Sequence, residues 1–295
     1  MAGPKHLLIE DQFFKGAQSL RKVFQERFAE PRLGSRERFV WDYWHVPRQY
    51  TLVRTPAQNF FPETIYKQFL LRILQWGERE LGCRAISPPW LSFYVDGCEQ
   101  ELHAHIPHGP WSFVYSLTHW SQREFKGGET VIAKPKLLEY WKSLAPSDYH
   151  EHSDFFTEVP ARFNRLVVFD PRLPHGVRRV SGVQDPRRAR LVIHGWFTQP
   201  QPYVDGPLDA AKLSRVLEPW EDGLRHEARR QRAQGVLTLR FKVQGGRLAG
   251  LKILSNTLVG APSASWLKKS LGILSTLEFP KDRQASSVTL PLYLS

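Results

Sequence analysis

The sequence contains little cysteine and no long hydrophobic run. Two cysteines, Cys83 and Cys98, stand among 295 residues, which excludes a disulfide framework and a cysteine zinc site. We expect both to be buried thiols. No apolar run approaches the roughly 20 residues that a membrane helix needs, so no membrane span is predicted. Residues 1–18 hold one short apolar patch, LLI, before acidic residues, so no secretory signal is expected and the cytoplasm is the predicted compartment.

The charge balance is basic but is not patterned. The chain has 41 Lys and Arg against 29 Asp and Glu, a formal net charge of +12. Such a surplus suits nucleic acid or acidic partners, but the arginines of RHEARRQR at 225–232 are read as a solvated helix face. With 41% hydrophobic and 24% charged residues, the composition is that of a globular protein.

Two helical patterns precede a region of short strands. Apolar residues recur at helical spacing in residues 11–30 and 63–81, which predicts two amphipathic helices. Residues 91–197 then change to short runs such as LSFYV, WSFVYSLT, RLVVFD and RLVIHGWF, separated by Gly, Pro and Asp. This pattern is typical of an all-β barrel or jelly roll, here braced by the N-terminal helices.

The C-terminal part predicts a separate small unit. Residues 205–234 form a helical linker in this prediction, with Pro219 interrupting or starting a helix. Residues 235–295 then read as strand, QGGR turn, strand, helix and strand. We therefore predict an α+β protein with a jelly-roll domain at 1–204, the linker, and a small ββαβ domain at 235–295.

Three separated elements of the barrel region carry residues suited to a metal site. His103 and His105 are two apart and face the same side of an extended strand, so they can address one metal together. His175, on a distant strand, can complete a face of an octahedron. A turn at FKGGET contains Glu129, and RLVIHGWF begins with Arg190.

In this order, the motifs resemble those of the iron(II)- and 2-oxoglutarate-dependent oxygenases of the prolyl 4-hydroxylase-like branch. That branch has Tyr, Gly, His-x-Asp, a Gly-Gly-Glu turn, a distal His, and an Arg on the last barrel strand. The resemblance covers about a third of the chain, from Tyr94 to Phe197. It implies a double-stranded β-helix fold, His103 and His175 as iron ligands, and iron(II), 2-oxoglutarate and dioxygen as cofactor and cosubstrates.

The resemblance also implies how 2-oxoglutarate is held. Arg190 matches the arginine that pairs with the distal carboxylate of the cosubstrate. Alternation along the strand places Arg190, Val192, His194 and Trp196 on one face, and a buried arginine needs an anionic partner. Tyr94 or Tyr115 is the expected hydrogen-bond partner of the cosubstrate.

The departure from the family pattern is at His105, which stands where the family has a carboxylate. Three hypotheses compete: His105 itself ligates the metal, it turns away and leaves an open coordination position, or the protein has lost iron and kept the fold. The first is favoured, because imidazole is a competent ligand. An all-nitrogen site also follows the divalent affinity order, so zinc, nickel or copper can compete with iron.

Other histidines receive ordinary structural interpretations. We interpret His108, His119 and His194 as hydrogen-bonded structural residues. His152 begins a literal His-x-Asp, but it follows the Gly-Gly-Glu turn in a polar loop and is interpreted as a coincidence. Glu129 is expected to anchor its turn.

The leading functional hypothesis is hydroxylation of an unactivated carbon in a peptide, protein or small metabolite. Nucleic acid is an unlikely substrate, because the nucleic-acid oxygenases usually carry a second arginine soon after the first, and residues 192–197 contain none. The alternative is a catalytically impaired scaffold that acts as a ligand- or protein-binding module. Residues 235–295 resemble the C-terminal domain of TonB-type and gliding-motility proteins, which implies a possible protein partner bound by strand addition.

Overall fold

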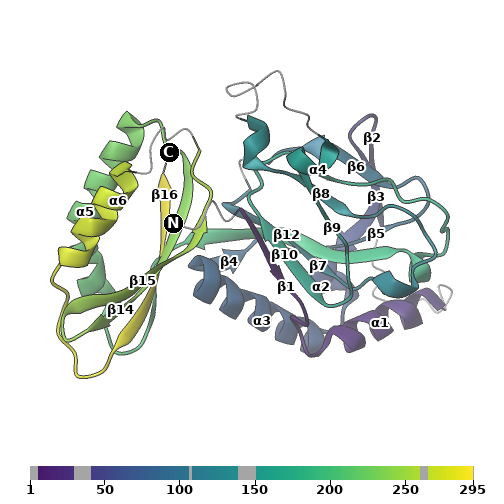
Figure 1. Ribbon diagram of the computed structural model, residues 1–295. Helices are drawn as coiled ribbons and strands as arrows, with labels where there is room; N and C mark the ends of the chain where they lie inside the picture. The colour runs from purple at the N-terminus through teal and green to yellow at the C-terminus, as the bar shows by residue number, and fades with distance from the viewer. Residues whose placement is uncertain (1–5, 30–40, 106–107, 139–150, 260–264, 295) are drawn as a thin grey trace, which may run out of the picture. The chain divides into compact units, whose positions relative to one another are not determined.

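The computed structural model describes residues 6–29, 41–105, 108–138, 151–259 and 265–294 (Figure 1). The chain divides into two compact units. The barrel unit comprises Leu7–Arg72 and Ser87–Trp196, and the sheet unit comprises Met1–His6, Ile73–Ile86 and Phe197–Ser295. The sequence predicts domain boundaries after residues 204 and 234, whereas the compact units have other boundaries and each is made of separate segments. The predicted domain division stays a prediction.

The barrel unit is built on a curled antiparallel sheet. Its strands follow the path β1-β10-β7-β12-β5-β3-β6-β11-β8-β9, and β2 pairs with β3. The bounds are β1 (Leu7–Glu10), β2 (Asp42–Val46), β3 (Tyr50–Pro56), β5 (Trp90–Tyr94), β6 (Glu99–His103), β7 (Trp111–Ser116), β8 (Thr130–Ala133), β9 (Phe156–Val159), β10 (Arg165–Phe169), β11 (His175–Val177) and β12 (Arg190–Pro200). The jelly-roll core predicted from the short strands is confirmed.

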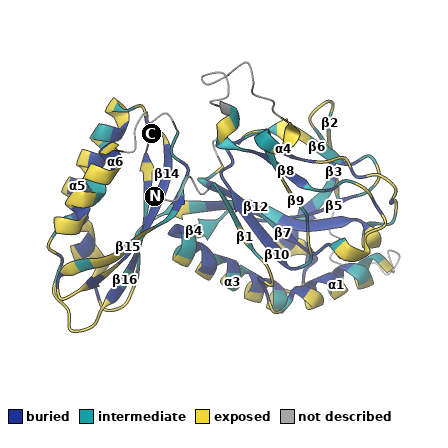
Figure 2. Ribbon diagram, in the orientation of Figure 1, coloured by how far each residue is buried: buried dark blue, intermediate teal, exposed yellow. Residues whose placement is uncertain are grey.

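Helices of the barrel unit cover the sheet with aromatic side chains. Helix α1 (Ala17–Ala29) starts later than the sequence pattern suggested and buries Ala17, Leu20, Arg21 and Phe24, the spacing of one helix face. Phe24 packs 5.7 Å from Phe60 of α2 (Ala57–Phe60), and 6.3 Å from Phe93 of β5, between ring centroids. Figure 2 shows these inner faces as buried. Burying each such ring stabilises the fold by roughly 1.5–3 kcal/mol.

Helix α3 (Glu63–Leu81) has the bounds that its apolar spacing predicts. The short helix α4 (His152–Phe155) begins at the His-x-Asp sequence and leads into β9. The segment at 41–62 forms the β2–β3 hairpin and α2. The all-β centre and its helical supports therefore follow the predicted order.

The sheet unit has a hydrophobic core of its own. Its four strands follow the order β13-β16-β14-β15, with bounds β13 (Tyr203–Asp205), β14 (Gly235–Gln244), β15 (Arg247–Asn256) and β16 (Ser286–Leu294). Helices α5 (Ala210–Arg230) and α6 (Ser265–Thr276) pack on the sheet. The predicted order of strand, strand, helix and strand is thus present, and α5 belongs to the same hydrophobic cluster rather than standing apart as a linker.

Helix α5 runs through Pro219 without interruption. Pro219 lies on the exposed side of the helix, while Leu213, Leu217 and Trp220 are buried. The sequence prediction that this proline interrupts or starts a helix is therefore wrong. Packing of the apolar stripe compensates for the missing backbone hydrogen bond.

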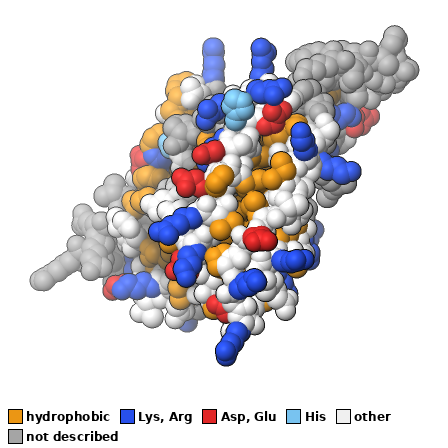
Figure 3. Space-filling model, turned by 90° about the vertical axis from the view of Figure 1, so that its left-hand side faces the viewer, with side chains coloured by type: hydrophobic (Ala, Val, Ile, Leu, Met, Phe, Trp, Pro, Cys, Tyr) orange, Lys and Arg blue, Asp and Glu red, His pale blue; other side chains and the backbone are white. Residues whose placement is uncertain are grey.

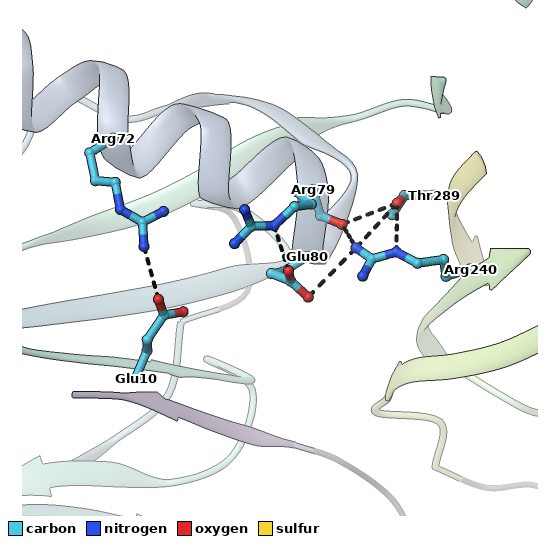
Figure 4. Close-up of polar contacts among 6 residues, drawn as sticks. All are labelled: Glu10, Arg72, Arg79, Glu80, Arg240 and Thr289. Carbon is cyan, nitrogen blue, oxygen red and sulfur yellow. Dashed lines mark hydrogen bonds and ion pairs between the residues drawn. The ribbon is translucent and has the colours of Figure 1, made fainter. Parts of the chain in front are cut away.

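The C-terminal turn of α3 belongs to the sheet unit and is capped by side chains (Figure 4). The backbone carbonyl of Arg79 accepts hydrogen bonds from Arg240 and, at 3.1 Å, from the Thr289 hydroxyl. Arg240 also forms an ion pair with Glu80 at 3.6 Å. The two hydrogen bonds satisfy a carbonyl group that the helix end leaves without an intrahelical partner. The following strand β4 (Cys83–Ile86) pairs with the end of β12.

The face drawn in Figure 3 agrees with the unpatterned charge of the sequence. On the face drawn in Figure 3, Lys and Arg side chains are spread among acidic and hydrophobic ones and do not gather in one patch. None of the helices in the described ranges is long and apolar enough to cross a membrane.

Candidate metal centre

The barrel unit encloses a cavity of about 640 Å³. Alternate residues of the surrounding strands point into it, as a period of two requires. Strand β12 contributes Arg190, Val192, His194 and Trp196, the face that alternation predicted. Other elements contribute further residues to the cavity lining, among them Tyr50, Arg54, Trp90, Tyr94, His103, His105, Thr130 and His175.

Three histidines meet at one wall of the cavity. His103 ends β6 and is paired with His175, which begins β11. His105 follows two residues after β6, where its backbone N–H donates to the carbonyl of Pro171 at 2.8 Å. One ring nitrogen from each of the three lies within 4.8 Å of the others. The structure therefore brings together the three residues predicted to ligate metal.

Backbone carbonyls fix the orientation of two of these rings. Nδ1 of His103 lies 2.7 Å from the carbonyl oxygen of Glu101, and Nδ1 of His175 lies 2.8 Å from that of Leu173. A carbonyl can only accept, so each Nδ1 carries a proton, and Nε2 is the nitrogen that has a lone pair in the neutral ring. Donation of the second ring nitrogen to a carbonyl is the arrangement typical of metal-ligating histidine.

The environment of the cluster keeps two of its imidazoles neutral. Burial lowers the pKa of His175 to about 3, helped by the neighbouring His103. Burial also lowers the pKa of His105 to about 4, with further contributions from His103 and His108. Both rings are thus neutral at pH 7, the form that binds a cation.

Arg190 is fully buried and lines the same cavity. Its Nε donates to the carbonyl of Gly128 at 2.8 Å, and Nη2 donates to the hydroxyl of Thr130 at 3.1 Å. The guanidinium carbon lies 4.5 Å from the ring centroid of Tyr94. Nη1 is buried and has no hydrogen-bond partner among the described residues. An orphaned charged donor facing a cavity is costly unless a ligand satisfies it, so this wall fits an anionic oxygen ligand.

The two candidate tyrosines differ in position. Tyr94 is buried beside Arg190, which it faces across β5 and β12, and it lines the cavity. Tyr115 instead points to the other side of β7, where its hydroxyl donates to Asn164 at 2.9 Å and its ring packs 5.0 Å from Phe69. The structure thus keeps Tyr94 in the candidate site and removes Tyr115 from it.

The Gly-Gly-Glu turn supports Arg190 through the backbone. Gly127 and Gly128 both have positive φ, 76° and 82°, a conformation that favours glycine. The carbonyl of Gly128 accepts from Arg190, while the Glu129 carbonyl accepts from the backbone of Arg178. Glu129 therefore belongs to the turn, as predicted.

The remaining histidines divide between the cavity and the outside. His194 lines the cavity and is hydrogen bonded to Ser92 at 2.8 Å, the structural role predicted for it. His108 also lines the cavity, with its ring 4.5 Å from that of Trp196, a position not foreseen from the sequence. His119 stacks on Phe163 away from the lining.

Several cavity residues were not predicted at all. The most notable is Arg54 of β3, which lies between the rings of Trp44 and Trp90. The run YTLVRTP alternates enough to place Tyr50, Leu52 and Arg54 on one face, and this was the available signal.

Comparison with known proteins agrees with the site. Residues 89–198, just over a third of the chain, match the family model of the 2OG-Fe(II) oxygenase superfamily. Residues 89–198 are therefore similar to this superfamily, which uses iron(II) and 2-oxoglutarate. No curated protein matches the chain. The resemblance of residues 235–295 to TonB-type domains receives no support from these comparisons.

Solved structures with similar folds share little sequence with this chain. A prolyl-4-hydroxylase from Pseudomonas putida is 18% identical, with 66% of this chain and 92% of that chain covered and a TM-score of 0.46. HygX from Streptomyces hygroscopicus, solved with nickel and 2-oxoglutarate bound, is 13% identical, with 66% and 84% covered and a TM-score of 0.44. The epimerase SnoN from nogalamycin biosynthesis is 10% identical, with 65% and 77% covered and a TM-score of 0.44.

Proposed function

We propose that this protein is an iron(II)- and 2-oxoglutarate-dependent oxygenase that hydroxylates an unactivated carbon of its substrate. In this proposal His103, His105 and His175 hold the metal, and Arg190 and Tyr94 hold the cosubstrate. The observation that carries it is the meeting, in one cavity, of three imidazole nitrogens within 4.8 Å and a buried guanidinium with an unpaired N–H.

The histidine cluster is suited to a divalent ion once its ring nitrogens, now within 4.8 Å of one another, move closer, because metal–nitrogen bonds are about 2.1 Å long. His103 and His175 already present Nε2 while their Nδ1 protons are engaged by Glu101 and Leu173. His105 supplies a third neutral nitrogen where the family has a carboxylate. When bound, iron(II) and 2-oxoglutarate would supply the electrons that reduce dioxygen to a form able to oxidise an unactivated carbon. The protein's part is to fix the ring orientations and leave the remaining coordination positions open.

Arg190 and its neighbours are suited to orient the cosubstrate. The unpaired Nη1 is positioned to donate to a carboxylate, while Gly128 and Thr130 keep the guanidinium plane fixed. The Tyr94 ring covers one face of the guanidinium and excludes water from it. A fixed fork loses little entropy when a carboxylate binds.

Anaerobic visible absorption of the iron(II)-loaded protein tests the proposal. We expect a charge-transfer band when 2-oxoglutarate is added to the wild-type protein. The band should vanish in His103→Ala and His175→Ala, and it should persist in His119→Ala, a control histidine outside the cavity. Under oxygen, a panel of candidate substrates is then screened for substrate-dependent succinate and for an added oxygen atom.

The variant His105→Asp separates the proposal from its alternative. A band in wild-type protein and in His105→Asp supports an assembled site in which imidazole replaces the carboxylate. A band in His105→Asp alone means that the histidine has disabled an oxygenase scaffold, and the protein is then a ligand- or protein-binding module. Retention of the wild-type band in His175→Ala contradicts the ligand set.

A further inference from the structure

Arg54 is clamped between two indole rings at the edge of the cavity. Its guanidinium carbon lies 3.3 Å from the ring centroid of Trp44 and 4.1 Å from that of Trp90. Its side chain is 15% exposed, and its Nε donates to Asp42 at 3.3 Å. Stacking of this kind holds the planar guanidinium in one orientation. Only its edge is left to meet a ligand.

That edge is available. Among the residues that the structure describes, Asp42 is the one hydrogen-bond partner of Arg54, and it uses Nε alone. The two Nη groups remain for a bound molecule, and they form the fork that matches a carboxylate. Because the stacking has already restricted the side chain, binding costs little further conformational entropy.

The charge of the cavity favours an anionic occupant. No Asp or Glu lines the cavity within the described ranges, whereas Arg54 and Arg190 both do. His105 adds no negative charge where a carboxylate would. Two guanidinium groups and a divalent metal bring four positive charges, of which 2-oxoglutarate neutralises two and Asp42, the hydrogen-bond partner of Arg54, neutralises one. One positive charge is left over, which suits a monocarboxylate.

The position of Arg54 separates it from the cosubstrate site. Arg190 pairs with Tyr94, whereas Arg54 pairs with Ser92 on the other side of β5. Two strand spacings, about 10 Å, therefore lie between the strands that carry the two arginines. Because Arg190 is assigned to the distal carboxylate of 2-oxoglutarate, Arg54 on a different strand is left for another ligand.

We propose that Arg54 recognises the carboxylate of a small organic acid whose flat apolar body lies against the aromatic wall of the cavity. Trp196, Pro88 and Pro89 line that wall beside Trp90. A volume of about 640 Å³ is typical of small-molecule sites. This inference rests on the proposed function, because the acid is then the molecule that the oxygenase oxidises.

Paired acids and amides test the recognition directly. Benzoate, phenylacetate and 3-phenylpropanoate, each with its primary amide, are titrated by calorimetry into anaerobic protein loaded with iron(II) and 2-oxoglutarate. At least one acid is expected to bind tenfold or more tightly than its amide. The preference should disappear in Arg54→Gln, persist in part in Arg54→Lys, and be unchanged in Arg84→Gln, an exposed arginine outside the cavity lining.

Three results overturn the proposal. They are the absence of any acid preferred over its amide, a preference that survives in Arg54→Gln, and loss of the 2-oxoglutarate charge-transfer band in Arg54→Gln, which would assign Arg54 to the cosubstrate. Titrations repeated without metal and 2-oxoglutarate keep the two proposals apart. If the wild-type protein gives no band but still prefers the acid through Arg54, the oxygenase assignment fails and the acid site stands.

Discussion

Exchange of one carboxylate for a methyl group in the cosubstrate isolates the contribution of Arg190. The compound 2-oxopentanoate keeps the keto-acid end of 2-oxoglutarate and replaces its distal carboxylate by methyl. In wild-type protein the unpaired Nη1 of Arg190 should donate to that carboxylate. A hydrogen bond to a charged group contributes roughly 1.5–3 kcal/mol, so we expect 2-oxoglutarate to bind about 30-fold more tightly than 2-oxopentanoate.

The variant Arg190→Met completes the cycle. Methionine has a similar length and no charge, so the affinity for 2-oxopentanoate should change little while the advantage of 2-oxoglutarate falls to about threefold or less. Dissociation constants are measured from the charge-transfer band of the anaerobic iron(II) protein, and near-ultraviolet circular dichroism checks that the variant is folded. If the 30-fold advantage survives in Arg190→Met, another cation holds the distal carboxylate and the assignment of Arg190 is refuted.

Three further predictions concern the fold. Gly127→Ala should destabilise the protein by about 2 kcal/mol more than Gly245→Ala in urea unfolding. Both glycines have positive φ, but a Cβ at Gly127 would lie 1.9 Å from the Arg179 carbonyl oxygen, whereas one at Gly245 meets nothing within 4 Å. Equal losses of stability in the two variants would refute the clash. Burial raises the pKa of the Cys83 thiol to about 12 and also raises that of Cys98, so neither should react with a thiol reagent at pH 8 until the protein unfolds; rapid labelling of native protein contradicts this. Burial, with Arg190 nearby, lowers the pKa of His194 to about 3 in the folded protein, whereas the histidine of the unfolded chain binds a proton below about pH 6.5. Lowering the pH from 7 to 5 therefore favours the unfolded state, and the metal-free wild-type protein should lose up to about 2 kcal/mol more stability than His194→Gln. Parallel pH profiles of the two proteins would rule out this burial effect.

The sequence was most informative where one face of an element is apolar. The stripe in residues 63–81 predicted α3 with its observed bounds, and alternation along β12 placed Arg190 and His194 toward the cavity. Such patterns are reliable because the period of a helix or strand decides which of its residues face the core, and those residues are apolar.

The failures occurred where both faces of a strand are buried. In β7 the large residue Tyr115 packs against Phe69 of α3, and the smaller Ser112 and Val114 line the cavity. Apolar residues fill both sides, so alternation does not show which side is the cavity. Tyr115 was therefore a candidate for the wrong side of the strand.

Long-range contacts also lay beyond the sequence. The stacking of Arg54 depends on Trp44 of β2 and Trp90 of β5, two segments that are 46 residues apart in numbering and meet only because β3 pairs with both strands. The carbonyl of Gly128 that orients Arg190 is likewise supplied by a distant turn. No local pattern reports which turn reaches which strand.

Strand β12 acts as a fixed scale along the cavity, since Arg190, Val192, His194 and Trp196 all point inward and successive inward positions are about 7 Å apart. Inserting one residue after Arg190 would turn the three later side chains to the outside of the barrel. Inserting two would restore their direction but move each by about 7 Å. The number of residues between two inward side chains therefore fixes their separation along the cavity. A change in the size of the bound molecule then requires exchange of side chains on this strand, because a change in strand length would displace all of them together.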